Sequence, residues 1–299
     1  MRAKKLIILY AVVLFLVVFA VTFNCVCAIA RFDVRFEVSS MTEEAQRVQA
    51  RLEEEYGGKS YLFFGQEDVE AIVLEEGGGY LTVESFSKTF PNVIHAEVRE
   101  KLEVLSVKLG DKYYAIDKDN TVLAINDTAV NNVSGNNTAL YGISPRDPDN
   151  PVQVGEQLTV AAEDAEAFEA FMGIFIKKDE EEKDEIDIIL ERTRDNIVSM
   201  RYSKDLVGLE YGGADLYIEM REGVCIWIMN CMEDTEAKVK TAMRAYLGLE
   251  EVTWGADEDD NPLPPRLLTD AERMYGYLTV LNASEPADYS TKPPQFTVE

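Results

Sequence analysis

The chain has 299 residues, a formal net charge of -26 and 46% hydrophobic residues. Its length is typical of one long or two modest globular domains, and its hydrophobic content is sufficient for a buried core. The acidity argues against nucleic acid as a partner, because phosphates require a surface of lysine and arginine. His95 is the single histidine, so the side chain that most often transfers protons near neutral pH is almost absent. This argues against a hydrolase.

An uncharged, apolar run covers residues 6–30 and follows Arg2, Lys4 and Lys5. A helix of this length would span about 37 Å, which exceeds the roughly 30 Å of a bilayer core. We therefore predict a cytoplasmic tail over 1–5 and a transmembrane helix over 6–30. The protein would then be a single-pass cell-membrane protein with its C-terminal part outside the cytoplasm. A cleaved signal peptide is the alternative, because residues 28–30 (Ala-Ile-Ala) match a small-x-small cleavage pattern.

Residues 31–101 predict a small α+β unit. Residues 31–38 alternate between polar and apolar side chains, as in a half-buried strand. A helix ending near Gly57 follows, with Ser40 and Glu43 spaced as in a capping box, and a second helix covers 66–74. Strands over 80–86 and 93–98 meet at a turn at Pro91-Asn92. This order of strand, helix, helix, strand and strand predicts two helices on one face of a three-stranded sheet.

Residues 102–282 predict a mainly β unit with a few helices. We expect strands over 105–109, 112–116, 121–124 and 186–190, and a hairpin of 216–220 and 224–229 around Glu222-Gly223. Helices are expected over 165–176 and 234–247, and a late strand over 275–281. Residues 126–151 are rich in Asn, Asp, Ser and Pro and read as a loop, and 283–299 as a flexible tail. We interpret the glycosylation sequons as chance products of composition; they begin at Asn126, Asn132, Asn136 and Asn282.

No group of residues predicts catalysis or metal binding. The sequence contains no nucleophile elbow, no His/Cys metal spacing and no phosphate loop. Residues 257–261 resemble the start of a calcium loop, but Pro262 and Leu268 stand where such a loop needs Gly and Glu. Cys225 and Cys231 would lie about 20 Å apart on one straight strand, so we expect free thiols unless that strand bends back. We predict a protein that is not an enzyme and has no cofactor, metal or small-molecule substrate.

Several motifs resemble the cell-division protein family FtsQ/DivIB. Ser87-Lys-Thr-Phe-Pro91 is similar to the aromatic-proline turn of the family's POTRA hairpin, and the Glu-containing strand that follows corresponds to 95–100. Residues 114–123 resemble a turn at which the family commonly has Gly and this chain has Asn120, a residue that also tolerates a left-handed conformation. The hairpin at Glu222-Gly223, the helix over 234–247 and the late strand match the family's β domain in order.

The resemblance implies a POTRA-like β-α-α-β-β domain over 31–101 and a β domain over 102–282. It implies a non-catalytic divisome scaffold at the division septum that helps regulate septal peptidoglycan synthesis. The implied partners are the membrane and FtsB/DivIC-like and FtsL-like division proteins. A partner strand would add to the late strand, with contacts from Tyr277, Leu278, Thr279 and Val280. The alternative function is an exported, membrane-anchored POTRA module in protein transport or surface signalling.

Overall fold

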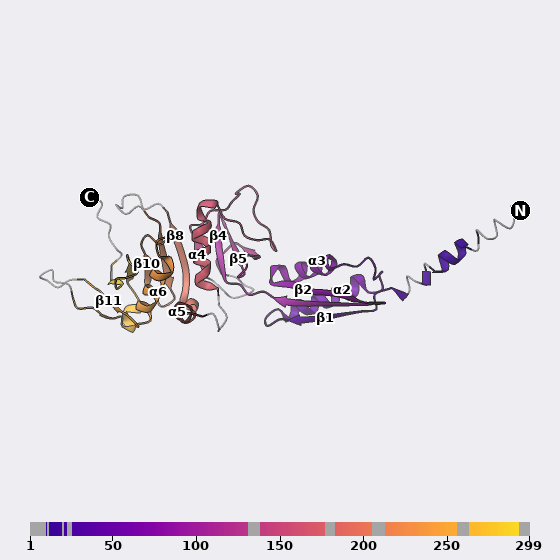
Figure 1. Cartoon of the computed structure of the whole chain (residues 1–299), viewed down its shortest axis with the longest axis horizontal. Helices are drawn as coiled ribbons and strands as arrows, with labels where there is room; N and C mark the ends of the chain where they lie inside the picture. The colour runs from indigo at the N-terminus through magenta and orange to yellow at the C-terminus, as the bar shows by residue number, and fades with distance from the viewer. Residues whose placement is uncertain are drawn as a thin grey trace. The chain divides into compact units, whose positions relative to one another are not determined.

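The computed structural model describes residues 10, 12–19, 21–22, 26–130, 138–176, 183–204, 213–255 and 263–292. Contacts divide the chain after Leu102 into two compact units, one residue beyond the boundary expected from the sequence. Both units combine helices with sheets that contain parallel and antiparallel pairs, so the α+β class is confirmed. Figure 1 shows the elements of each unit.

The first unit has the expected order of elements. Its members are β1 (Arg31–Glu37), α2 (Thr42–Tyr56), α3 (Gln66–Gly77), a 3-10 turn (Gly78–Tyr80), β2 (Leu81–Thr89) and β3 (Val93–Glu100). The sheet order is β1-β3-β2, in which β3 pairs in parallel with β1 and antiparallel with β2. The hairpin between β2 and β3 turns at Phe90-Pro91, whose peptide bond is cis.

Apolar side chains of the helices and the sheet form the core of this unit. Val48 and Leu52 of α2 and Val69 of α3 are fully buried, as are Ile94 and Val98 of β3. These residues follow the helical spacing on α2 and every second position on β3, which gives each element one apolar face. The two apolar faces therefore meet and exclude water.

The loop before α2 differs from the expected capping box. The helix begins at Thr42. Met41 occupies the N-cap position before it and makes no side-chain hydrogen bond to the helix. Ser39 and Ser40 instead donate hydrogen bonds from their backbone amides and hydroxyls to the carboxylate of Glu100 at the end of β3. The capping-box prediction is wrong because the strand end offers Ser40 a charged acceptor that the sequence pattern does not reveal.

Glu100 should make the stability of this unit depend on pH. Burial acts against its charge, but the hydrogen bonds from Ser40 and Ser39 outweigh burial and lower the pKa of Glu100 from 4.5 to about 2. Its stabilising effect is thus present above pH 4.5 and is lost as the pH falls toward 2. We expect Glu100→Gln to cost about 1 kcal/mol at pH 7 and progressively less below pH 4.

Urea denaturation across this pH range would measure the effect. Glu54→Gln, on the exposed face of α2, is the matched control, because its side chain is exposed and makes no described hydrogen bond or ion pair. Equal losses of stability for both variants at pH 7 would contradict the assigned role of Glu100.

The described part of the apolar N-terminal run does not show the expected transmembrane helix. In the described portion of the chain, no helix combines the length and the apolar composition needed to cross a bilayer. The end of the run belongs to the first unit: the Ile29 amide donates to the Lys59 carbonyl at 2.8 Å, and the Tyr61 amide donates to the Cys27 carbonyl at 2.7 Å. Cys27 and Ile29 are buried. The predictions of a helix over 6–30 and of a single-pass membrane location are therefore corrected, because part of this apolar run fills a protein core.

The second unit is built on a sheet with the strand order β14-β13-β10-β9-β8-β7-β4-β5-β6. These strands are β4 (Leu105–Leu109), β5 (Lys112–Ile116), β6 (Val122–Asn126), β7 (Ala139–Tyr141), β8 (Ile197–Ser203), β9 (Asp215–Met220), β10 (Cys225–Ile228), β13 (Tyr277–Val280) and β14 (Asp288–Ser290). The helices are α4 (Ala165–Phe175), α5 (Glu185–Thr193), α6 (Thr235–Tyr246) and α7 (Asp270–Arg273), and β11 (Glu251–Val252) pairs with β12 (Arg266–Leu267) as a separate small sheet.

The expected loop over 126–151 contains the strand that joins the two halves of this sheet. β7 pairs in parallel with β4 on one side and with β8 on the other. The meander β4-β5-β6 and the meander β8-β9-β10 are thus connected through three residues, of which Ala139 and Leu140 are almost fully buried. A strand of three residues is too short to show a period-2 pattern, so the surrounding polar composition concealed it.

A second correction concerns residues 186–190, which lie in helix α5 and not in a strand. The Asp184 carboxylate accepts from the Asp187 amide, and the Asp187 carboxylate accepts from the Asp184 amide, both at 3.0 Å. This reciprocal capping box starts the helix. Ile189 and Leu190 then face the core. A short apolar run is compatible with either a strand or a buried helix, and here the capping residues favour the helix.

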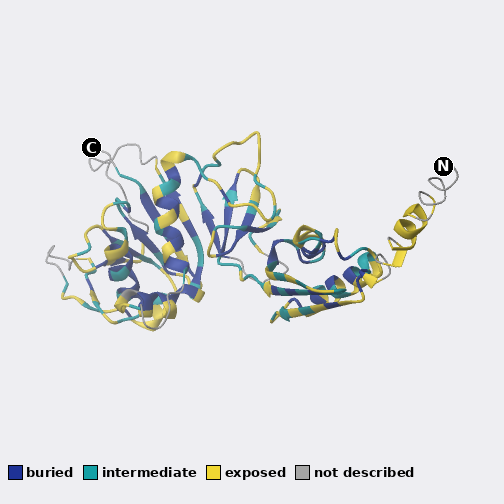
Figure 2. Ribbon diagram, turned by 45° about the vertical axis from the view of Figure 1, so that its right-hand side comes forward, coloured by how far each residue is buried: buried dark blue, intermediate teal, exposed yellow. Residues whose placement is uncertain are grey.

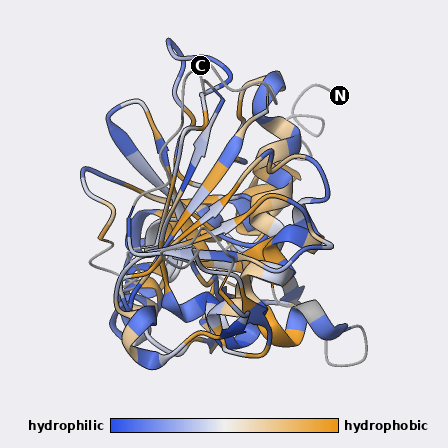
Figure 3. Cartoon of the chain, turned by 90° about the vertical axis from the view of Figure 1, so that its left-hand side faces the viewer, coloured by the Kyte–Doolittle hydropathy of each residue, from blue (hydrophilic) through white to orange (hydrophobic). Residues whose placement is uncertain are grey.

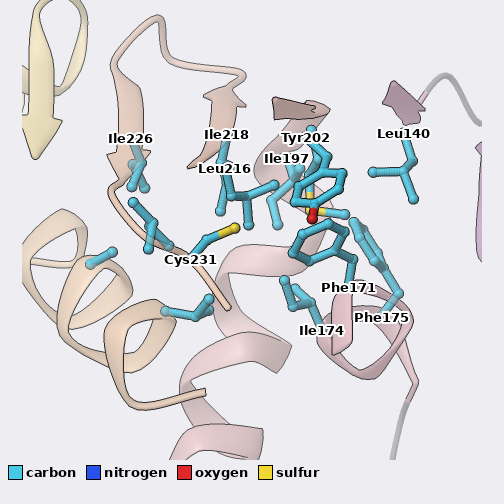
Figure 4. Packing of buried hydrophobic residues seen from close by; sticks show 14 of the residues in the cluster. Leu140, Phe171, Ile174, Phe175, Ile197, Tyr202, Leu216, Ile218, Ile226 and Cys231 are labelled. Atoms are coloured by element: carbon cyan, nitrogen blue, oxygen red, sulfur yellow. The ribbon is translucent and has the colours of Figure 1, made fainter. Parts of the chain in front are cut away.

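One face of the large sheet packs against α4, α5 and α6. Buried side chains from these helices and from alternate strand positions form a single apolar cluster. Figure 4 shows Phe171, Ile174 and Phe175 of α4 beside Leu140 and Tyr202, and the rings of Phe171 and Tyr202 meet edge to face at 5.4 Å. Burial is concentrated along the strands and the inner sides of the helices (Figure 2), whereas hydrophilic residues dominate the loops (Figure 3).

Candidate protein-binding edge

The four residues expected to contact a partner form β13, which lies inside the sheet. Thr279 is paired with Trp227 of β10 on one side and with Asp288 of β14 on the other. Leu278 and Val280 are buried in the apolar cluster. The expectation that this strand has a free edge is therefore wrong, because β14 occupies that edge. Contact of Tyr277, Leu278, Thr279 and Val280 with a partner stays a prediction.

The actual end strand, β14, comes from the segment that was expected to be a flexible tail. Tyr289 is buried, and its hydroxyl donates to the Tyr275 carbonyl at 3.2 Å. This single aromatic side chain anchors a strand in a region whose prolines and polar residues suggested no structure. Residues 293–299 of the expected tail lie outside the described residues.

The outer edge of β14 is partly occupied by Thr253. The Thr253 amide donates to the Ala287 carbonyl at 2.9 Å, and the Tyr289 amide donates to the Thr253 carbonyl at 2.7 Å. Thr253 follows β11, so the small sheet brings one residue against the end of the large sheet. Such a cover protects a strand edge from unspecific pairing. It also means that a partner strand would have to displace Thr253 in order to pair with this part of β14.

A buried polar cluster fixes the chain between β10 and α6. Asp215 is 2% exposed and accepts from the Trp227 indole nitrogen at 2.6 Å and from the Asn230 amide at 2.9 Å. The Lys238 ammonium, also buried, donates to the Met229 and Asn230 carbonyls. Burial raises the pKa of Asp215, against the effect of its hydrogen bonds with Asn230 and Trp227. The cluster holds the backbone reversal after β10.

Asp215→Ala should destabilise the second unit by about 2 kcal/mol, because it removes the acceptor of one buried and one part-buried donor. The donors are the indole nitrogen of Trp227 and the amide of Asn230. Asp149→Ala, at an exposed loop position, is the control and should change the free energy of unfolding little. Chemical denaturation followed by circular dichroism measures both. A loss below about 0.5 kcal/mol for Asp215→Ala would show that the cluster does not stabilise this reversal.

The three described cysteines and His95 do not form a reactive site. Cys27, Cys225 and Cys231 are free thiols, and Cys25 lies outside the described residues. Burial raises the pKa of Cys225 to about 11 and that of Cys231 to about 12, so both remain protonated near neutral pH. His95 lies on β3 with its ring nitrogens 3.0 Å from the Thr89 hydroxyl and 3.2 Å from the Asp33 carboxylate.

The other sequence motifs that the structure describes do not come together as a site. The side-chain nitrogen of Asn126 is buried at the end of β6, which makes this sequon inaccessible, whereas Asn282 is exposed. The sequons at Asn132 and Asn136 and the calcium-like segment 257–261 lie outside the described residues. Among the residues that are described, no group of three or more His, Cys, Asp or Glu side chains could hold a metal ion.

Comparisons with known proteins do not assign this chain to a family. A scan against protein-family models and a search of curated proteins each found no match.

Proposed function

We propose that the protein is a non-catalytic scaffold of the bacterial division machinery, with the role that FtsQ/DivIB-type proteins have. In this proposal it binds FtsB/DivIC-like and FtsL-like proteins and helps regulate septal peptidoglycan synthesis. The function rests on resemblance in the order and type of elements, and fold alone does not define function. Its test must therefore be made in cells and with partners.

One observation carries this proposal. A β-α-α-β-β unit with the sheet order β1-β3-β2 is followed directly by a separate unit with a large mixed sheet. The first arrangement is the one that the POTRA resemblance implies, and the second unit lies where the resemblance expects the β domain. The aromatic-proline turn that first pointed to the family lies between β2 and β3, where Phe90 is exposed.

The arrangement of the large sheet refines where a partner strand would bind. Because β13 is internal, strand addition at the C-terminal end of the sheet would involve β14. Backbone hydrogen bonds would supply much of the affinity in that mode. The contact of Thr253 with Ala287 and Tyr289 would then be exchanged for contacts with the partner.

A fluorescent fusion of the full chain in dividing cells of the source organism tests the proposal. We expect a band at mid-cell, and we expect the tagged full chain to co-purify with an FtsB/DivIC-like protein from the same cells. An even distribution, together with normal division after depletion, would exclude a division role. The POTRA module acting in protein transport or signalling would then be the better explanation.

A further inference from the structure

The face of the large sheet that points away from α4, α5 and α6 carries a continuous row of aromatic and cationic side chains. Successive strands in a sheet place one residue each in such a cross-strand row, about 4.8 Å apart. The backbone register brings six residues from six neighbouring strands into line, in the order Tyr113, Lys108, Tyr141, Arg201, Tyr217 and Trp227. The row is therefore about 24 Å long. We name these six residues the cation–aromatic row.

The members of the row contact one another closely. The Lys108 ammonium lies 5.6 Å from the centre of the Tyr113 ring and 5.9 Å from that of Tyr141, and the Arg201 guanidinium lies 5.4 Å from the Tyr141 ring centre. Tyr217 and Trp227 stack at 5.2 Å, and because Trp227 is 2% exposed, the accessible part of the row ends at Tyr217. Each cation is thus held over a ring by attraction to the ring's negative face, and the row is ordered before any partner arrives.

Both cations of the row lack a carboxylate partner. The chain has 55 acidic and 29 basic residues, and most described arginines, such as Arg51 and Arg244, make ion pairs. Within the described residues, neither Lys108 nor Arg201 makes one, although Arg201 is exposed and Lys108 is half-buried. In such an acidic protein, two ordered and unpaired cations on a helix-free face leave positive charge for a ligand to neutralise.

The ring geometry limits the chemistry of this ligand. Ligands that stack, such as nucleobases, need open ring faces, but cations occupy a face of Tyr113 and a face of Tyr141. Burial, together with a hydrogen bond involving Tyr113, raises the pKa of Tyr141 to about 12, so its hydroxyl stays neutral. Beside the row, Ser106, Ala115 and Ala139 are at most 1% exposed, and the Ser199 hydroxyl donates to the Glu219 carboxylate. A ligand would therefore contact the outer ends of the row's own side chains.

We propose that the cation–aromatic row binds an acidic segment of a partner protein, whose carboxylates pair with Lys108 and Arg201. Tyrosine and arginine are among the residues that contribute most to binding energy in protein interfaces, and charge complementarity selects the acidic partner. The row adds a second binding surface to the proposed scaffold. It does not depend on that role, because the charge of the row defines its ligand.

Fluorescence anisotropy with the full-length protein tests the row directly. The probe is a labelled peptide of alternating glutamate and alanine, which places carboxylates on one face of an extended chain. The same peptide with glutamine in place of glutamate is the neutral control. We expect the acidic peptide to bind, and we expect the double variant Lys108→Gln/Arg201→Gln to weaken its binding about tenfold.

Two further variants separate recognition from general effects of charge. Arg192→Gln/Lys292→Gln removes the same charge from exposed positions outside the row and should leave the affinity unchanged. Lys108→Arg/Arg201→Lys keeps both charges and should retain most of the binding, which would exclude misfolding as the cause of a loss.

Three results would overturn the proposal. The first is an absence of acidic-peptide binding to the wild-type protein. The second is equal weakening of this binding by the two charge-removing double variants. The third is tighter binding of an oligogalacturonate than of the acidic peptide, which would make the ligand an acidic glycan. None of these measurements uses a division protein, so they are independent of the mid-cell localisation test.

Discussion

Gly142→Ala is expected to prevent the second unit from folding stably. Gly142 follows β7 with a φ of 88°, and a Cβ atom at this position would lie 1.8 Å from the backbone carbonyl oxygen of Tyr202 in β8. Backbone atoms of a paired strand cannot move aside without separating β7 from β8. The positive φ alone costs about 1 kcal/mol for an alanine, and the clash adds several kcal/mol, a large part of a typical domain stability of 5–15 kcal/mol.

Gly110→Ala is the matched control for this clash. Gly110 also has a positive φ, 60°, but a Cβ atom there would meet nothing within 4 Å. We expect this variant to lose only about 1 kcal/mol. Thermal unfolding followed by circular dichroism measures both variants. Similar melting temperatures for the two variants would show that the backbone of β8 does not approach Gly142 as closely as the structure indicates.

Leu140→Ala is the second change with a large expected effect. Leu140 is the middle residue of β7, it is fully buried in the apolar cluster, and it lies opposite Val107 of β4 and Met200 of β8. Truncation of a fully buried leucine costs about 2–5 kcal/mol, through lost burial and the cavity left behind. We expect a value in the upper half of this range, because the strands on both sides limit how far the cavity can collapse.

The control for Leu140→Ala is Leu267→Ala in β12. Leu267 is 50% exposed, so its truncation should cost less than about 1 kcal/mol. Urea denaturation of the two variants gives the comparison. If Leu140→Ala cost no more than Leu267→Ala, β7 would not be the strand that connects the two meanders.

Much of the first unit could be predicted because its elements are long and regular. The alternation of Phe32, Val34 and Phe36 predicted β1, and the helical spacing of Ala45, Val48 and Leu52 predicted α2. Local sequence determines such elements when one face is apolar over several repeats. The hairpin of β9 and β10 was predicted from the same kind of alternation.

The candidate binding surfaces depended on information that no local pattern contains. The family resemblance implied that Tyr277–Val280 form an edge strand, and the local sequence could not show that Tyr289 would anchor another strand beside it. The aromatic and basic members of the cation–aromatic row are spread from residue 108 to residue 227. They become neighbours only through the order of strands in the sheet, which β7 establishes.

The sequence by itself determined the α+β class, the division into two units close to Leu102, and the amphipathic elements long enough to repeat a pattern. Only the tertiary structure decided the short strands β7 and β14, the helix at α5, and the burial of Cys27 and Ile29 in a protein core. The physical reason is that a strand of three residues has no periodicity of its own, and that a short apolar run such as 186–190 is compatible with either a strand or a helix. Its conformation is chosen by the partners that bury its side chains and complete its backbone hydrogen bonds.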